Sequence, residues 1–570
     1  ISVPTNPSSI PVVEAGVIEK LDNALNLAII FHQHQPYYKN KLTDMYEMPW
    51  VRVHAMTEYV DSPGILGETD TKVTYNLVPS FLEQLLEYHN DNSTLDVHTD
   101  IAKRPWTEGS YPNATDLELH TMQFQSFWNS GWIYNVSQDD TKLGWLYPSS
   151  SRYSDLYDMT LHNLKPATIM NDELLSPSDF LDLQVLWYLY QFSPDYVLGN
   201  YNSSHRDQGL IDLFMQNGNY NHSDLMYVLD KQQLHMGNVL PMYGELARDG
   251  QVELTTTPYY HPIMPLLMQD GWQMEDGIRV NKDSWPDDVQ LQLNNGMDLF
   301  ESEIGFRPVG MWPSEQAVSP GMVEPVSDVG VEWMVTDEEI LMKSTTGQDD
   351  AFVDVEIASQ LTTPWITTGS EGGEVAVIFR DRYISDRIAF AYGKMTPEEA
   401  VTDFISYIDN MRQQLLDEGK NPSDHLLTVA LDGENWMFMS EFQHQDNARP
   451  FMKEWYSRLS THPSIITTTP SEFLEKNITL PHINSIGTGS WIDGTLRTWA
   501  GEPEESLAWQ RLVEARTSLV DFELEYPTHP GLADAWESLY IAEGSDWYWW
   551  YGLDQDSGYD ENWDVLFKVH

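Results

Sequence analysis

The sequence predicts an α/β fold in which parallel strands form a barrel. Short apolar runs recur along the 570 residues, and most of them end in a cluster of polar or aromatic residues. Several runs lead directly into helical patterns, and strands that alternate with helices are typical of a parallel sheet. Seven or eight such units, with polar residues at the strand ends, favour a barrel whose site lies at the carboxyl-terminal rim.

The predicted strands are short apolar runs bounded by polar or aromatic clusters. In chain order they cover residues 25–31, 72–76, 252–256, 308–312, 331–336, 375–379 and 426–431. Helical patterns at 79–89 and 319–330 follow the second and fourth strands, and a third at 396–419 precedes the seventh. A further strand-then-helix pattern lies near 465–476, so the alternation continues past the seventh strand.

Two stretches interrupt this alternation. The chain from about 90 to 245 is aromatic and largely helical in pattern, as in "SDFLDLQVLWYLYQF", and is interpreted as an insertion beside the barrel mouth. After about 485 the pattern is again mostly helical, as in "EESLAWQRLVEARTSLVDFE". We therefore expect an N-terminal extension over 1–22, a catalytic barrel with its insertion over 23–484, and a C-terminal helical domain over 485–570.

The composition excludes several classes of function. The net charge is −57, and nucleic acid is not expected as a partner because phosphate binding needs clustered cations. The chain has no cysteine, so it forms neither disulfides nor thiolate metal sites. No apolar run approaches the length of a membrane span, so we expect a soluble chain without a membrane partner.

Charge and sequons together predict the environment of the protein. A strongly acidic surface favours adaptation to high salt, where screening relieves self-repulsion, although it also fits a solvated surface that resists aggregation. The chain begins with Ile1 rather than methionine and carries six Asn-x-Ser/Thr sequons, which favours secretion. The sequons lie at Asn92, Asn113, Asn135, Asn202, Asn221 and Asn477.

Two carboxylates stand just past predicted strands, each beside an indole. In "LLTVALDGENWMF" the apolar run stops at Asp432, and in "RPVGMWPSEQAVS" it stops at Trp312, three residues before Glu315. A carboxylate that caps a turn is common after a strand, but two such strand ends in one barrel point two carboxylates into one site. Glycoside hydrolysis needs such a pair, one as nucleophile or base and one as acid. The 21 tryptophans also suit sugars, whose apolar ring faces stack on indole.

Histidines and arginines supply further candidates. His32 and His34 in "FHQHQPYY" are two residues apart, so in an extended chain they face the same side. They could ligate zinc, donate hydrogen bonds to sugar hydroxyls and carboxylates, or form a buried structural pair. "GQVELTTTPYYHPIMPLL" places Glu253 on a strand and His261 after it.

Two cations in "VIFRDRYISD" stand near the end of another predicted strand. Arg380 and Arg382 could lower the pKa of a neighbouring carboxylate, because an opposite charge favours the ionised form. The alternative is a structural salt bridge to Asp381 or Asp386. Both interpretations stay open at the level of the sequence.

Four motifs occur in a recognisable order: "HQHQP", "GQVELTTTPYYHPIMPLL", "GMWPSEQAVS" and "VALDGENW". Together they resemble glycoside hydrolase family 57, and the resemblance runs from about residue 25 to the end of the chain. Within that family, "TTTPYYHPI", "GSWIDGTLRTWAGEPEE" and "AEGSDWYWWYG" are most similar to the amylopullulanases. The resemblance implies an incomplete (β/α)7 barrel with a helical C-terminal region, and a retaining mechanism.

The resemblance also implies roles for individual residues. Glu315 matches the nucleophile of the family, and Asp432, the first carboxylate of "DGEN", matches its general acid/base. The residues expected to line the sugar-binding site are His32, His34, Glu253, His261, Trp312, Glu434, Trp436, Trp491, Asp546 and Trp547. No residue is assigned as a metal ligand.

The implied activity is hydrolysis of α-1,4 and also α-1,6 bonds in starch, amylopectin and pullulan. The alternatives within the family are an α-amylase, a 4-α-glucanotransferase or a branching enzyme, and a more distant one is a metal-dependent carbohydrate deacetylase using His32 and His34. A glucan-binding protein without catalysis is a third class, against which the intact Glu315 and Asp432 argue. Catalysis would need no cofactor, and the many acidic oxygens are compatible with structural calcium. The expected partner is an α-glucan polysaccharide or oligosaccharide.

Overall fold

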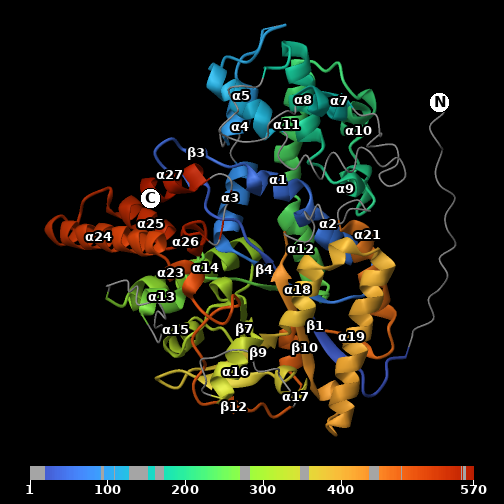
Figure 1. Ribbon diagram of the computed structural model, residues 1–570, viewed down its shortest axis with the longest axis vertical. Coiled ribbons are helices and arrows are strands. Elements are labelled where there is room, and N and C mark those ends of the chain that lie inside the picture. Colours follow the sequence, from blue (N-terminus) through green and yellow to red (C-terminus); the bar gives the residue numbers. More distant parts are fainter. Residues whose placement is uncertain are drawn as a thin grey trace.

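Two five-stranded sheets lie at the centre of the structure, a computed structural model, and helices surround them (Figure 1). The structure describes residues 19–90, 96–107, 109–126, 152–160, 173–269, 283–346, 358–434, 448–476, 478–553, 555, 557 and 560–570. Strands alternate with helices along most of this chain, which confirms the predicted α/β class.

The first sheet is entirely parallel. Its main path has the order β10-β1-β4-β5, and β11 pairs with the beginning of β1. The strands are β1 Leu25–Gln33, β4 Val73–Leu77, β5 Val252–Thr255, β10 Leu426–Asp432 and β11 Ile465–Thr467. All five match predicted strands within a few residues.

The second sheet has the order β12-β8-β9-β7-β6, and β9, β7 and β6 run parallel to one another. Its strands are β6 Gly310–Met311, β7 Trp333–Asp337, β8 Trp365–Thr368, β9 Glu374–Arg380 and β12 His482–Ile483. The sequence did not predict β8 and β12. They are short, and β8 is mostly outside the core, so neither presents the continuous apolar run of a buried strand.

Two backbone contacts link the sheets. Thr256, just past β5, forms a parallel bridge with Met311 of β6. At the other side, the amide of Asp381 after β9 donates to the carbonyl of Thr428 in β10 at 2.8 Å. The predicted barrel requires contacts of this kind on both sides.

A small core cluster lies between the two sheets. Because side chains alternate along a strand, every second residue of β1 and β10 faces this cluster, while Leu27, Ile29 and Phe31 belong to the larger outer core. The members of the inner cluster are Ala28, Ile30, Trp312, Trp333, Val335, Ala376, Ile378, Leu426, Ala430 and Phe473. The strands of both sheets therefore enclose one common interior.

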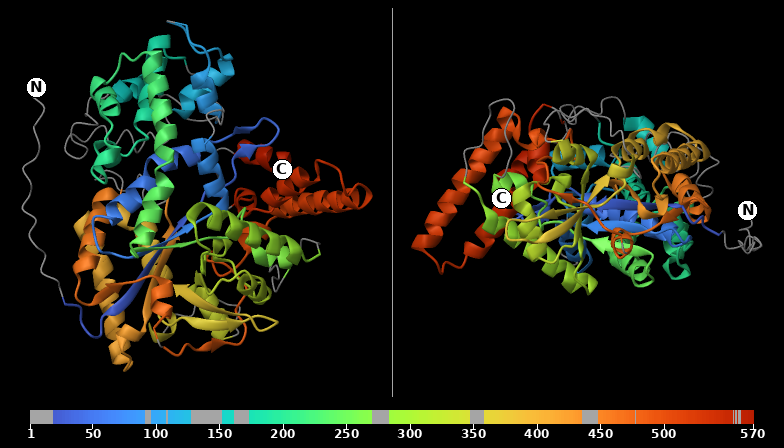
Figure 2. Two further views of the ribbon diagram at one scale, coloured as in Figure 1. Left: turned by 180° about the vertical axis from the view of Figure 1, so that it is seen from behind. Right: turned by 90° about the horizontal axis from the view of Figure 1, so that it is seen from below.

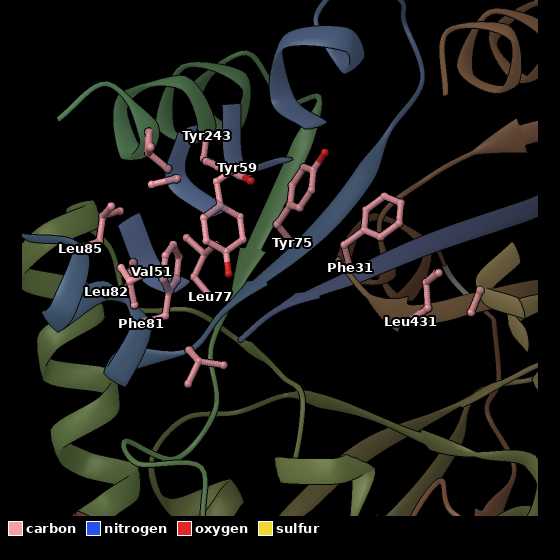
Figure 3. Close-up of a cluster of buried hydrophobic side chains, with 14 of the residues drawn as sticks. Phe31, Val51, Tyr59, Tyr75, Leu77, Phe81, Leu82, Leu85, Tyr243 and Leu431 are labelled. Atoms are coloured by element: carbon pink, nitrogen blue, oxygen red, sulfur yellow. The ribbon is translucent and has the colours of Figure 1, made fainter. Parts of the chain in front are cut away.

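The outer face of the first sheet packs against helices that follow its strands. Figure 3 shows Phe31, Tyr75 and Leu77 beneath Tyr59 and Tyr243. The Tyr75 ring stacks on Phe31 with centroids 5.7 Å apart and meets Tyr243 edge-on at 4.8 Å. The helices are α1 Trp50–Met56, α2 Glu58–Leu66, α3 Pro79–Asn90 and α12 Val239–Arg248.

Further helices cover the strands of the second half of the chain. They are α13 Met264–Met268, α14 Pro286–Ile304, α15 Val323–Asp328, α16 Glu338–Thr346, α17 Ala358–Leu361, α18 Arg382–Phe390, α19 Pro397–Asp417, α21 Arg449–Thr461 and α22 Pro470–Leu474. The helix α19, predicted at 396–419, begins with a capping box between Thr396 and Glu399. None of the described helices is both long and apolar enough to cross a membrane.

The main described elements of the predicted insertion are helices, and they lie above the sheets in Figure 1. Its helices before α12 are α4 Val97–Lys103, α5 Asp116–Gln125, α7 Arg152–Thr160, α8 Pro177–Leu189, α9 Pro194–Leu198, α10 Gln208–Gln216 and α11 His222–Met236. Residues 180 and 182–189 of α8 are all buried, which explains why most of that segment is apolar; the polar exceptions are Asp182 and Gln184.

The C-terminal segment forms helices to one side of the sheets (Figures 1 and 2). They are α23 Arg497–Ala500, α24 Pro503–Glu525, α25 Leu532–Ala542, α26 Ser545–Trp549 and α27 Asp560–Val569. Arg516 of α24 pairs with Asp288 of α14 through two bonds of 2.7 and 2.9 Å, and Gln292 of α14 bonds Glu543 at 2.9 Å. These polar contacts join the C-terminal helices to α14, and the Ser545 amide at the start of α26 donates to the His261 carbonyl at 3.0 Å.

Candidate active site

The register of β1 and β10 brings His32 and Asp432 side by side. In this parallel pair His32 lies opposite Asp432. Both residues continue the inward-facing alternation of their strands, His32 after Ile30 and Asp432 after Ala430. The apolar inner cluster therefore ends, at the carboxyl ends of the strands, in an imidazole and a carboxyl group.

Glu315 is held at the end of β6 by a strained turn and by residues far along the chain. Its backbone is left-handed, with φ of 57° and ψ of 24°, a conformation that is costly for a residue with a Cβ and recurs at functional sites. Trp491 Nε1 donates to Glu315 Oε2 at 3.1 Å, and Ser545 Oγ donates to Glu315 Oε1 at 3.0 Å. The carboxylate therefore has a fixed direction, and its side chain is only 12% exposed.

Three histidines lie next to this carboxylate. His32 Nε2 and His261 Nε2 are 3.1 Å apart, and the rings of His34 and His261 have centroids 3.9 Å apart. His32 Nδ1 contacts Asn76 Oδ1 at 2.7 Å, and His261 Nδ1 contacts Ser545 Oγ at 2.9 Å. A continuous chain of polar contacts thus runs from Asn76 through two imidazoles and Ser545 to Glu315.

The histidine nitrogens are also close enough to hold a cation. One ring nitrogen from each of His32, His34 and His261 lies within 4.8 Å of the other two. Neutral imidazoles are suitable ligands for zinc and similar metals. Asn76 and Ser545 contact the Nδ1 atoms of His32 and His261, which leaves the two Nε2 atoms 3.1 Å apart.

Glu434 lies behind Asp432 in a network of its own. Its Oε1 accepts from the backbone amide of His34 at 2.7 Å and from the hydroxyl of Tyr59. The positive charges of His34 and Arg380 lower the pKa of Asp432, and the negative charge of Asp432 raises the pKa of Glu434. The first carboxyl of "DGEN" therefore faces the histidines, and the second one secures the β1 end.

Burial and mutual repulsion raise the pKa values of the acidic groups. Burial raises the pKa of Glu315 to about 7, with the negative charges of Asp432 and Asp546 adding to the effect and His34 opposing it. Burial raises the pKa of Asp432 to about 6 and that of Glu434 to about 7. These carboxyl groups exchange protons near neutral pH, as acid–base catalysts must.

His34 is the cation of this cluster. Burial opposes its charge, but Asp546, at 3.4 Å from its Nε2, together with Glu315 and Glu434 raises its pKa to about 9. The pKa values of His32 and His261 are lowered by burial and by the neighbouring charge of His34, so both are neutral. One positive and two neutral rings therefore line the acidic pair.

Arg380 and Arg382 are mainly structural. Arg380 bonds Asp337 at 2.7 Å and Asp386 at 2.9 Å, and Arg382 bonds Glu339 and Asp493. The predicted bridge to Asp386 is present, whereas Asp381 instead caps α18. Arg380 also lies over the Trp491 ring at 5.2 Å and lowers the pKa of Asp432 after burial has raised it.

The structure brings together most of the residues predicted from the sequence. Trp312 stacks beneath His32 with ring centroids 4.6 Å apart and meets Trp491 edge-on, so it supports the site from the inner cluster. Together with the carboxylates, the assembled set is His32, His34, His261, Trp312, Glu434, Trp491 and Asp546.

Three predicted residues are not part of this set. Glu253 accepts hydrogen bonds from Trp333 and Ser471 beside the inner cluster, because it lies two residues before the end of β5 rather than past it. Trp547 is 1% exposed, and its indole N–H donates to the Ile541 carbonyl, which is the environment of a core residue. Trp436 lies outside the described residues.

Sequence reasoning missed Ser545, Tyr59 and Asn76. Ser545 stands next to Asp546 in "AEGSDWYWWYG", and a serine at the start of a helix is common without any role in a site. Tyr59 sits on helix α2 and Asn76 on strand β4, each in a sequence typical of the core. Only the folded chain brings their polar atoms to the site.

Comparison with known proteins places this geometry in a family. The model of glycosyl hydrolase family 57 matches residues 28–483. An alpha-amylase of Pyrococcus abyssi is 24% identical over 240 residues, which are 42% of this chain and 30% of that protein. A 4-alpha-glucanotransferase of Thermococcus litoralis is 21% identical over 243 residues, 42% of this chain and 29% of that protein. The matched region thus spans less than a third of these relatives.

A solved structure agrees over most of the chain. The GH57-type branching enzyme of Pyrococcus horikoshii superposes with a TM-score of 0.55, covering 96% of this chain and 87% of that one, at 15% sequence identity. An identity this low shows a common fold alone. It does not distinguish an amylase from a transferase or a branching enzyme.

Proposed function

Because the chain belongs to glycosyl hydrolase family 57, we propose that it is a retaining glycoside hydrolase that acts on α-glucans. The observation that carries the proposal is the pair of buried carboxyl groups, Glu315 and Asp432, whose charges interact in one site. The alpha-amylase, glucanotransferase and branching enzyme to which the chain is similar support an α-glucan as the substrate.

The mechanism assigns one role to each carboxyl group. The Glu315 carboxylate attacks the anomeric carbon and forms a glycosyl ester, while the Asp432 carboxyl donates its proton to the leaving glycosidic oxygen as that bond breaks. Asp432, now a carboxylate, then removes a proton from water, which attacks the same carbon and displaces Glu315. Two displacements at one carbon retain its configuration.

The active form of the pair carries one proton. The roles require that proton on Asp432, although Glu315 has the higher pKa, about 7 against about 6. Both singly protonated forms have the same pH dependence, since they differ only in which group holds the proton. The pH profile of kcat/KM is therefore a bell whose limbs fall near 6 and 7.

The remaining side chains bind and orient the sugar in this proposal. The positive His34 faces Glu315 and Asp546 and offsets their negative charge. The neutral His32 and His261 can exchange hydrogen bonds with sugar hydroxyls. The Trp491 indole, which already holds Glu315, supplies an apolar surface beside the reacting carbon.

We also propose that the parallel strands close into an incomplete (β/α)7 barrel. The seven strands would be β1, β4, β5, β6, β7, β9 and β10, and four of them, β1, β7, β9 and β10, contribute to the apolar inner cluster. The bridge from Thr256 to Met311 supports closure between β5 and β6, and the hydrogen bond from Asp381 to Thr428 supports closure between β9 and β10. The catalytic residues would then lie at the carboxyl-terminal rim.

The bond specificity is proposed from the resemblance to amylopullulanases: cleavage of both α-1,4 and α-1,6 bonds. Product analysis on pullulan tests it. Maltotriose shows α-1,6 cleavage, and panose or isopanose shows α-1,4 cleavage. Release of no product from pullulan, with activity on amylose, would instead support an alpha-amylase, a 4-alpha-glucanotransferase or a branching enzyme. Secretion and salt adaptation stay predictions from the sequons and the charge.

The histidine cluster supports a second candidate, a metal-dependent carbohydrate deacetylase. His32, His34 and His261 would then hold the metal. Dialysis against a chelator, followed by assays of glucan cleavage and of acetate release, separates the two functions. Glucan cleavage that persists without metal supports the glycosidase, and acetate release that returns only with added zinc supports the deacetylase.

A further inference from the structure

A cavity lined by none of the catalytic residues lies where α14 meets the C-terminal helices α24 and α25, which are labelled in Figure 1. Its volume is about 810 Å³, within the range of sites that hold small molecules or a few sugar rings. The lining residues come from the Tyr259–Tyr260 turn and from all three helices. Nothing in the proposed mechanism uses this groove.

Aromatic rings make up part of the lining of the groove. Trp536 and Tyr540, one helical turn apart on α25, stack with ring centroids 5.7 Å apart, and both are partly exposed. Tyr259, in the turn after β5, is also partly exposed and lines the same groove. Flat apolar faces with polar edges suit pyranose rings, which have an apolar face and a rim of hydroxyls.

The aromatic platform is held rigidly. The Trp536 indole N–H donates to Glu523 at 3.1 Å, and the Arg516 guanidinium lies 5.6 Å from the same ring. Arg516 is fixed in turn by its two bonds to Asp288. A platform ordered before binding loses little conformational entropy when a ligand arrives.

The charge of the lining selects the class of ligand. Six lining residues are acidic and only one is basic: Asp287, Asp288, Asp298, Glu523, Asp534 and Glu537 against Arg516. Arg516 is already neutralised by Asp288, so an anionic ligand would meet only repulsion. The carboxylates can accept hydrogen bonds from hydroxyl groups, and the Asn295 amide can both accept and donate them. A neutral polyhydroxylated chain fits this lining.

The groove is separate from the catalytic residues, although it shares a short turn with them. His261 points to Ser545 and His32 in the active site. The two preceding residues point the other way, with the Tyr259 hydroxyl donating to Glu83 and the Tyr260 hydroxyl to Glu537. The turn over residues 259–261 therefore lies between the two sites and contributes side chains to both.

We propose that this groove is a second, non-catalytic binding site for an α-glucan chain, with Trp536 and Tyr540 as its stacking platform. The choice of ligand rests on the proposed function, since an α-glucan is the neutral polysaccharide that function supplies. A polymer bound at both places gains effective concentration at the catalytic pair, because the second contact is intramolecular.

Calorimetric titration with maltoheptaose tests the site. The full-length Glu315→Gln protein serves as the parent, so that the ligand is not consumed, and EDTA is present throughout. We expect two binding sites per chain in the parent and one after adding Trp536→Ala. Ala533→Trp, which places an indole into the groove from an exposed lining position, should also remove one site. This blocking variant leaves the packing around Trp536 intact.

Tyr526→Ala is the matched control. It removes an aromatic residue that is 48% exposed at the end of α24 but does not line the groove, and two sites should remain. A parent with one site, or two sites left in both groove variants, would overturn the proposal. Glucan cleavage by the wild type is measured separately. Two sites without cleavage would contradict only the proposed function, and cleavage with a single site would contradict only the groove.

Discussion

The chain secures its two central carboxyl groups in opposite ways. Asp432 ends a regular strand, and its position follows from the register of β10 on β1. Glu315 follows a two-residue strand, adopts a left-handed backbone, and is held by Trp491 and Ser545, which lie 176 and 230 residues further along the chain. One group is positioned by the sheet and the other by the C-terminal segment.

This difference shows what the C-terminal helices contribute to the site. A strained turn persists only where its surroundings fix it, and here Ser545, at the start of α26, and the loop carrying Trp491 do so. The same Ser545 joins Glu315 to His261 and through it to His32 and Asn76. The geometry of Glu315 should therefore be more sensitive to the C-terminal segment than that of Asp432.

Glu315→Ala removes the group on which the comparison depends and should have the largest effect. Without a nucleophile no glycosyl ester forms, and turnover should fall by several orders of magnitude, on the order of 5 kcal/mol in barrier. Initial rates on amylose, with circular dichroism to confirm folding, measure it. A folded variant with near-normal rates would remove Glu315 from its role.

Asp432→Asn should impair natural glucans more than aryl glycosides. An activated phenol leaves without a proton, so the first step survives while water attack slows, and an early burst of phenol appears. The acid/base assignment fails if both substrates lose activity equally and no burst is seen. Glu434→Gln should be milder on starch, because Glu434 bonds the His34 amide and Tyr59 rather than the reacting atoms.

Ser545→Ala sharpens the comparison because it removes a hydrogen bond that holds Glu315, together with the contact to His261. Losing a hydrogen bond to a charged group should lower kcat by about 10- to 100-fold, equivalent to roughly 1.5–3 kcal/mol. That bond lowers the pKa of Glu315 against the larger effect of burial, so its loss should move the alkaline limb of the pH profile, the one near 7, to higher pH. Ser518→Ala, on the exposed face of α24, is the control. An unmoved alkaline limb would mean that Ser545 does not act on Glu315.

The smallest expected effect is on stability. Burial raises the pKa of Glu315 from 4.5 to about 7, so the folded protein loses stability as pH rises between these values, and the loss is complete above 7. Glu315→Gln should therefore raise Tm at pH 8, on the order of 1–2 °C for a chain this long, and leave it unchanged at pH 4. Scanning calorimetry at both pH values measures the difference. Equal Tm values at pH 8 would contradict the burial of an ionised Glu315.

These two groups also show how far the sequence could predict the molecule. The ends of β1 and β10 were predictable because a buried apolar run stops abruptly at His32 and at Asp432. Ser545 was not, since its role depends on folding α26 against a turn 230 residues away. The sequence could not exclude Glu253 from the site, because a motif gives the residue type but not its position along β5. It could not exclude Trp547 either, because a core indole looks the same in sequence as one that binds sugar.

The most direct test of the account is to identify the residue that carries the covalent intermediate. A fluorinated glucosyl fluoride forms a slowly hydrolysed ester with the nucleophile of a retaining glycosidase, and peptide mapping by mass spectrometry locates the label. The account predicts a single label on Glu315 in the wild type and no label when the Glu315→Gln variant is treated with the same reagent. A label on Asp432, whose lower pKa would suit a nucleophile, or an unlabelled enzyme that releases sugar of inverted configuration, would contradict it.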